Sequence, residues 1–218
     1  MNVFFGFVFT KGKKCSILYF TKEAVKMRTS EISRNTKETQ IKVSLDLDGG
    51  DADISTGIGF FDHMLTAFAV HGGFGLRVDV HGDLEVDCHH TIEDTGIVLG
   101  KAFDKALGDK SGIKRFGSFY VPMDEALGFC ALDISGRPFL VFDAAFPEER
   151  IGGYDSCMTE EFMRAFAYNS GITLHLQCPY GKNSHHMTEA LYKALAHALR
   201  EAVTLTGSDK PLSTKGVL

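Results

Sequence analysis

The chain has 218 residues, of which 44% are hydrophobic, so it can bury a sizeable core as one or two compact units. Its net charge of −5 gives no general attraction to nucleic acid or to anionic membranes, so any phosphate must be bound by a local basic cluster. Five cysteines without a C-x-x-C pair are typical of free thiols, which predicts a protein of the reducing cytoplasm without a disulfide framework.

The first segment of the chain, residues 1–26, differs in character from the rest. Its apolar stretch "VFFGFVF" is too short to span a bilayer, which takes roughly 20 apolar residues. The basic residues follow this stretch, whereas they precede it in a secretory signal. We predict that residues 1–26 are an unstructured N-terminal extension and that residues 27–218 form the functional domain.

An internal duplication explains the order of the remaining elements. A shift of 96 positions lays Gly75–Asp94 over Gly171–Ala190, and further upstream a shift of 87 lays Glu38–Gly50 over Glu125–Arg137. Alternating apolar residues predict strands, and i, i+3, i+4, i+7 spacing predicts amphipathic helices between and after them. Each half therefore reads β-β-α-β-β-α. We predict an α+β fold of two repeats, 28–108 and 111–206, each a small sheet with helices on one face, followed by a tail, 207–218.

Each repeat carries the pattern His-His-x-x-Glu where its last helix is predicted to begin. Residues three apart share a helix face, whereas adjacent residues diverge by about 100°. The second histidine and the glutamate of one copy are therefore predicted to bind one ion, while the first histidine reaches across to the ion of the other half. This predicts two metal sites with exchanged ligands: His90, Glu93 and His185 at one, and His186, Glu189 and His89 at the other.

A solvated histidine pair at a helix start is the alternative interpretation of either cluster alone. Repetition at a fixed offset favours the metal sites. Imidazole and carboxylate ligands without thiolate suit Mn, Fe or Zn and do not choose among them.

The helix before each cluster offers further polar side chains. "FFDHML" contains Asp62 and His63, and a two-residue length difference places Glu161 over His63 as a fourth ligand in the other half. His71 lies about 12 Å further along the first of these helices, too far to bind the same ion, so we expect it to contact a substrate. The alternative for His71 is a helix C-terminal histidine that the macrodipole favours.

Four basic residues near these elements suggest an anion pocket. They lie in turns or on a helix of an otherwise acidic chain, and arginine binds phosphate bidentately. The alternative is that each is a solvated surface charge. The residues are Arg115, Arg137, Lys193 and Lys215.

With these residues assembled, the sequence resembles the imidazoleglycerol-phosphate dehydratase family from about residue 28 to 218. The resemblance rests on "RNTKET", "FFDHML", "HHTIED", "GIKRFG", "DISGRP", "GITLHL", "GKNSHHMTEA" and "STKGVL". It implies a hydro-lyase of histidine biosynthesis that converts D-erythro-imidazole glycerol phosphate into imidazole acetol phosphate, with an imidazolate bound between two metal ions. It also implies the fold of ribosomal protein S5 domain 2, and a homo-oligomeric shell of twenty-four subunits built from trimers, with metals at subunit contacts.

The resemblance also implies a role for each motif residue. Glu38 would be the acid–base carboxylate, and His71 would lie near the substrate hydroxyls. One manganese ion would be bound by His63, His90, Glu93 and His185, and the other by His89, Glu161, His186 and Glu189. The phosphate would be held by Arg115, Arg137, Lys193, Ser213 and Lys215, which makes 207–218 a substrate-binding tail.

Glu161 departs from many relatives, which carry histidine there. Carboxylate remains a competent manganese ligand, although Zn²⁺ or Fe²⁺ could also be bound.

Two other classes of function compete with this interpretation. A non-catalytic metal sensor or storage protein explains the two clusters but gives no reason for Glu38, His71 and a basic tail. An RNA-binding module fits related ribosomal folds, but the acidic balance and the lack of a basic aromatic surface argue against it.

Overall fold

The first half of the chain forms a four-stranded sheet. The structure is a computed structural model that describes residues 27–216, so the predicted extension, 1–26, lies outside the described residues. In strand β2 the inward side chains of Ile41, Val43 and Leu45 are at most 2% exposed and alternate with outward polar residues, as expected for a half-buried sheet. The strands pair in the order β1-β2-β4-β3 and are β1 (Thr29–Asn35), β2 (Thr39–Asp46), β3 (Ala52–Ser55) and β4 (Gly75–Gly82).

The second half repeats this arrangement in the order β5-β6-β10-β7. In the first sheet β4 is antiparallel to β2 and parallel to β3, and in the second sheet β10 is likewise antiparallel to β6 and parallel to β7. A small separate hairpin, β8 (Arg150–Ile151) with β9 (Tyr154–Asp155), leads into the second pair of helices. The four main strands are β5 (Phe116–Met123), β6 (Ala126–Asp133), β7 (Phe139–Asp143) and β10 (Thr173–Tyr180).

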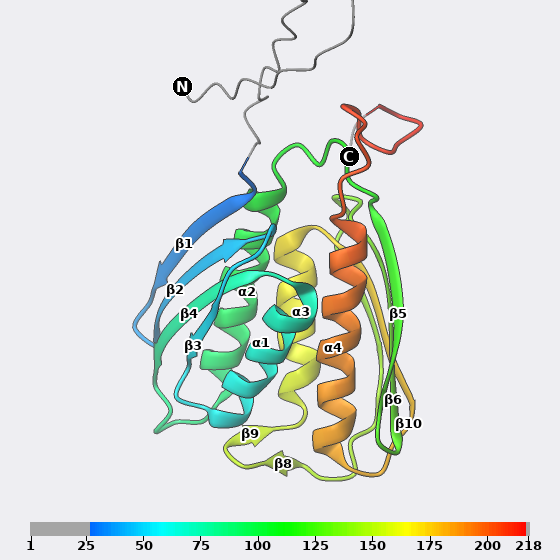
Figure 1. The fold of residues 1–218 in the computed structure, drawn as a ribbon. Coiled ribbons are helices and arrows are strands. Elements are labelled where there is room, and N and C mark those ends of the chain that lie inside the picture. The colour runs from blue at the N-terminus through cyan, green and yellow to red at the C-terminus, as the bar shows by residue number, and fades with distance from the viewer. Residues whose placement is uncertain (1–26, 217–218) are drawn as a thin grey trace, which may run out of the picture.

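The helices lie side by side between the two sheets (Figure 1). Helix α2 packs on β1 and β2, and α4 packs on β5 and β6. Helix α1 of the first half packs on α4 of the second, and α3 of the second packs on α2 of the first. The two halves therefore share one core, and residues from both meet along the helix contacts. The bounds are α1 (Gly59–Gly72), α2 (His89–Leu107), α3 (Met158–Ser170) and α4 (Ser184–Ala202).

The predicted duplicated α+β fold is confirmed, with one refinement of order. In each half the third strand precedes the first helix, whereas the sequence pattern placed it after that helix. Strand β3 has only four residues and no side chain in the buried class, so it carries a weak strand signal. Within residues 27–216 no helix is long and apolar enough to cross a membrane.

Candidate active site

Three predicted ligands converge where α1 meets α4. The Nε2 atoms of His63 and His185 lie 3.5 and 3.3 Å from Oε2 of Glu189, and the candidate ligand atoms all lie within 4.8 Å of one another. The Glu189 side chain is 8% exposed, so its carboxylate is buried beneath two imidazoles. Nitrogen and oxygen donors this close together suit Mn²⁺, Fe²⁺ or Zn²⁺, so these residues fit a divalent ion.

Electrostatics keep the Glu189 carboxylate charged. Burial alone would raise its pKa, but the hydrogen bond from Lys193 Nζ at 2.7 Å and the nearby imidazoles of His63 and His185 lower the pKa overall. An ionised carboxylate is the form that binds a cation.

The duplication assigns a counterpart to each of these ligands. His63 lies ten residues before Gly73, the left-handed C-cap of α1, and Glu161 lies ten residues before Gly171, the left-handed C-cap of α3. On α2, His89 Nε2 lies 3.4 Å from Glu93 Oε2, as His185 lies from Glu189 on α4. Among residues 27–216, however, only the first set converges to metal-binding distance.

Within one chain the structure groups the ligands differently from the predicted division between the two ions. The predicted division pairs each glutamate with the second histidine of its own copy, three residues before it. In the structure each glutamate instead contacts the first histidine, four residues before it. Both spacings share a helix face, but residues four apart are offset by only about 40° around the axis, against about 60° for residues three apart. Within one chain, therefore, His63 and His185 accompany Glu189 rather than Glu93.

The second histidine of each copy points to a carboxylate outside its helix. His90 Nδ1 lies 3.0 Å from Asp83 Oδ2, and His186 Nδ1 lies 2.7 Å from Glu125 Oε2. These hydrogen bonds raise the pKa of both histidines. The contact with His186, followed by the backbone N–H of Lys182, lowers the pKa of Glu125 to about 2. Sequence reasoning missed Asp83 and Glu125, although Glu125 is the repeat counterpart of Glu38.

Glu38 is presented by the turn between β1 and β2. Its backbone N–H donates to Thr36 Oγ1 at 3.1 Å, and the adjacent Thr39 Oγ1 donates to the buried carboxylate of Asp94 on α2 at 2.6 Å. The Glu38 side chain is exposed and lies close enough to His90 for its charge to contribute to the raised pKa of that histidine. The turn therefore holds a carboxylate beside one of the predicted metal ligands.

His71 lies at the end of α1 and pairs with a histidine that the sequence analysis did not single out. His71 Nδ1 lies 3.2 Å from His197 Nε2 on α4, and the His197 ring stacks on Phe119 with centroids 4.3 Å apart. Burial, followed by the charge of Lys193, lowers the pKa of His71. His71 is therefore neutral at pH 7 and lies near the Lys193 and Glu189 side chains.

Except for Lys193, which contacts Glu189, the predicted phosphate residues lie at the opposite end of α4 from the metal group. The Arg115 side chain donates to Asp133 at 2.6 Å and to the backbone oxygen of Leu212 in the tail. The backbone N–H of Arg115 donates to the backbone oxygen of Ala202, the last residue of α4. His185 lies in the first turn of α4, and the helix is about 27 Å long. Figure 1 shows this separation of the α4 start from the C-terminal tail. One chain alone does not bring both groups around one small substrate.

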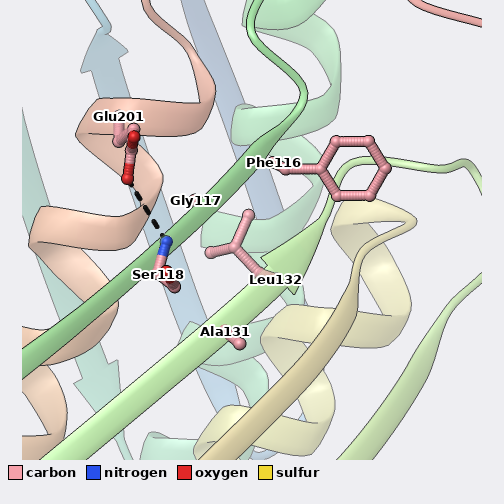
Figure 2. Close-up of a pocket in the computed structure, with 6 residues that line it drawn as sticks. All are labelled: Phe116, Gly117, Ser118, Ala131, Leu132 and Glu201. Carbon is pink, nitrogen blue, oxygen red and sulfur yellow. Dashed lines mark hydrogen bonds between the residues drawn. The ribbon is translucent and has the colours of Figure 1, made fainter.

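Surface hollows elsewhere do not contain the predicted residues. A hollow of about 280 Å³ between β5, β6 and α4 is lined by Phe116, Gly117, Ser118, Ala131, Leu132 and Glu201, with the Ser118 N–H bonded to Glu201 (Figure 2). A second hollow, of about 370 Å³, lies beside the end of α1. Neither is lined by a cluster of metal-ligating side chains, so the candidate active site is the exposed surface around His63 and His185.

Comparison with known proteins identifies the family. The family described as imidazoleglycerol-phosphate dehydratase matches residues 56–199. Curated enzymes of that name from Thermoanaerobacter pseudethanolicus and Caldanaerobacter subterraneus subsp. tengcongensis are 58% and 59% identical to this chain over 194 residues, which span 88% of it and all of each relative.

Two solved structures of that name also resemble this one. The Staphylococcus aureus enzyme has 39% identity and a TM-score of 0.75, with coverage of 82% of this chain and 99% of its own. The Pyrococcus furiosus enzyme, in complex with (S)-C348, has 38% identity and a TM-score of 0.75, with coverage of 86% and 100%. The chain therefore belongs to the imidazoleglycerol-phosphate dehydratase family.

Proposed function

We propose that this chain removes water from D-erythro-imidazole glycerol phosphate to give imidazole acetol phosphate in histidine biosynthesis. The observation that carries this proposal is the convergence of His63, His185 and Glu189, in a chain of this family, on a space that suits a divalent ion. The comparisons do not favour a non-catalytic metal sensor as the alternative.

Two manganese ions are the proposed cofactors. One would be held by His63, His185 and Glu189, and the other by their repeat counterparts Glu161, His89 and Glu93. When bound, the ions would supply the Lewis acidity that favours loss of the ring N–H proton of the substrate, and the resulting imidazolate would promote loss of the neighbouring hydroxyl.

The protein side chains would direct the rest of the elimination. The carbon next to the ring loses its hydroxyl and the following carbon loses its proton, so one water leaves and an enol forms, which tautomerises to the ketone. Glu38 is the proposed acid–base group, because its exposed carboxylate lies beside His90. His71 would contact the substrate hydroxyls, and Lys193 would help to hold the phosphate so that the chain is oriented for elimination.

We propose that the complete site needs several copies of the chain. Arg115, Arg137, Ser213 and Lys215 lie far from the metal group within one chain, so their contribution to phosphate binding requires a neighbouring subunit. A cytoplasmic homo-oligomer of twenty-four subunits, built from trimers as in the family resemblance, would supply such contacts without nucleic acid or membrane partners.

The proposed function is tested by turnover of imidazoleglycerol phosphate by the purified chain. We expect ketone product with Mn²⁺ and none after chelation. The Glu38→Gln variant should lose about 10²- to 10⁴-fold in kcat with metal content unchanged, because it removes the acid–base group and no ligand. Glu31→Gln is the matched control, because Glu31 is an exposed residue of β1 whose carboxylate pairs with Lys42 of β2. Absence of turnover by the manganese-loaded chain would contradict the proposal.

A further inference from the structure

The second histidine of each cluster is oriented by a carboxylate that lies outside the metal groups described above. Asp83 contacts His90, with both carboxylate oxygens 3.0–3.2 Å from Nδ1, and Glu125 contacts His186 at 2.7 Å. Both contacts use Nδ1, although Asp83 follows β4 and Glu125 precedes β6. The same atom of the ring is thus engaged in both halves.

The direction of these hydrogen bonds decides which nitrogen remains available. An ionised carboxylate accepts and does not donate, so Nδ1 must carry the proton. The lone pair available for a metal is then on Nε2. For His186 this atom lies 3.6 Å from the exposed carboxylate of Asp124, which is longer than a hydrogen bond. Histidines that bind metals commonly donate their other N–H to a carboxylate in this way.

We propose that Asp83 and Glu125 are positioning residues that hold His90 and His186 with Nδ1 protonated, so that each ring offers Nε2 as a metal ligand. This inference rests on the proposed metal-dependent function. Each metal group within one chain has three candidate ligands. Of the eight predicted ligands, His90 and His186 are the two that belong to neither group, which leaves one for each.

Asp83 and Glu125 do not occupy equivalent positions in the two repeats, so the duplication alone does not explain why each contacts a histidine. Glu125 precedes β6 as Glu38 precedes β2, so Glu38 and Glu125 are the repeat counterparts. The 96-residue shift of the duplication lays Pro179, which has no carboxylate, over Asp83. Residues at non-equivalent positions therefore make the same contact.

The exchange of roles has a consequence for Glu38. In the second half Glu125 orients the histidine, whereas in the first half Asp83 does so. The Glu38 carboxylate makes no hydrogen bond or ion pair with any other residue in 27–216, and is left for proton transfer.

A glutamine at position 125 separates orientation of the ring from support of the loop. Glu125 Oε1 accepts the backbone N–H groups of Lys182 and Asn183 at 3.0 and 2.9 Å, while Oε2 faces His186. In Glu125→Gln the amide oxygen must stay with the two backbone donors, so its NH₂ faces Nδ1. That donor reverses the hydrogen bond and leaves the proton on Nε2, where it blocks metal binding.

The test measures metal content and affinity by calorimetry, with ¹⁵N NMR to identify the histidine tautomers. Glu125→Gln should weaken binding of Mn²⁺ by about 10- to 100-fold while the protein keeps its circular dichroism spectrum. Asp124→Asn, which removes a nearby charge without contacting Nδ1, should bind metal as the unchanged chain does. In the other half, Asp83→Ala should lose affinity and Asp83→Asn should keep it, because the asparagine amide can turn its oxygen to Nδ1–H.

The outcomes distinguish this inference from the proposed function. If the unchanged chain binds no divalent ion, the proposed metal-dependent function fails. If it binds ions and Glu125→Gln binds them equally well, Glu125 only supports the loop and the inference is overturned. Unchanged affinity in Asp83→Ala would overturn it as well, and that variant is informative even if changes at position 125 prevent folding.

Discussion

At the scale of single residues, Glu161 shows how the duplication assigns a role to a side chain in an unremarkable setting. It lies in the first turn of α3, where a helix dipole favours acidic residues, and Arg164 Nε lies 3.7 Å from its carboxylate. These contacts alone suggest a solvated charge. Its place relative to the C-cap glycine, which matches that of His63, instead suggests a metal ligand.

Substitution of Glu161 tests this assignment. Glu161→Ala should lower metal content toward one ion per chain and remove most turnover, because the second group then keeps two ligands on α2. Glu161→His should retain both ions and bind Zn²⁺ more tightly, because imidazole suits zinc. Glu160→Ala, which removes an ion pair with the same Arg164, is the control and should change neither quantity. Metal content measured by mass spectrometry decides the matter, and two ions in Glu161→Ala would refute the assignment.

At the scale of elements, the contact between α2 and α3 depends on glycine. A Cβ atom added at Gly100 would lie 2.7 Å from the backbone oxygen of Phe166, and one added at Gly96 would lie 2.9 Å from that of Phe162. Backbone atoms cannot yield as a flexible side chain can. These glycines let the helix with His89 and Glu93 approach the helix with Glu161.

Gly100→Ala should therefore destabilise the protein, although alanine is the better helix former by about 1 kcal/mol. Overpacking of this kind costs about 1–3 kcal/mol, so thermal unfolding at matched protein concentration should show a lower Tm. Gly59→Ala is the control, because a Cβ atom at that first residue of α1 meets nothing within 4 Å. Equal Tm values for the two variants would contradict the role assigned to Gly100.

The sequence predicted the helices and the cluster residues more reliably than their pairing. Repeated spacing located α2 and α4 and placed Glu161 over His63, because a helix period and a duplication are both local patterns. The choice between i+3 and i+4 partners, and the carboxylates that hold His90 and His186, depend on how loops and strand ends lie in space. Glu125 is distant from His186 in sequence, so no periodicity joins them.

At the scale of the whole molecule, one chain presents an incomplete site. The His63 and His185 side chains are 51% and 42% exposed, and the residues proposed for phosphate binding, apart from Lys193, lie at the far end of α4. A small substrate cannot reach both ends of a helix about 27 Å long. Assembly of several chains is the arrangement that would bring the two groups together.

Metal should therefore control assembly as well as turnover. Without ions, no metal bond joins the ligands of one chain to those of another at the proposed contacts between chains. Ions bound by residues of more than one chain stabilise the assembled form by mass action. We expect chelation at neutral pH to give smaller particles, and Mn²⁺ to restore the large one, as measured by light scattering. Mg²⁺, which prefers oxygen ligands, should restore it poorly. An unchanged particle size after complete removal of metal would show that assembly does not depend on the ions.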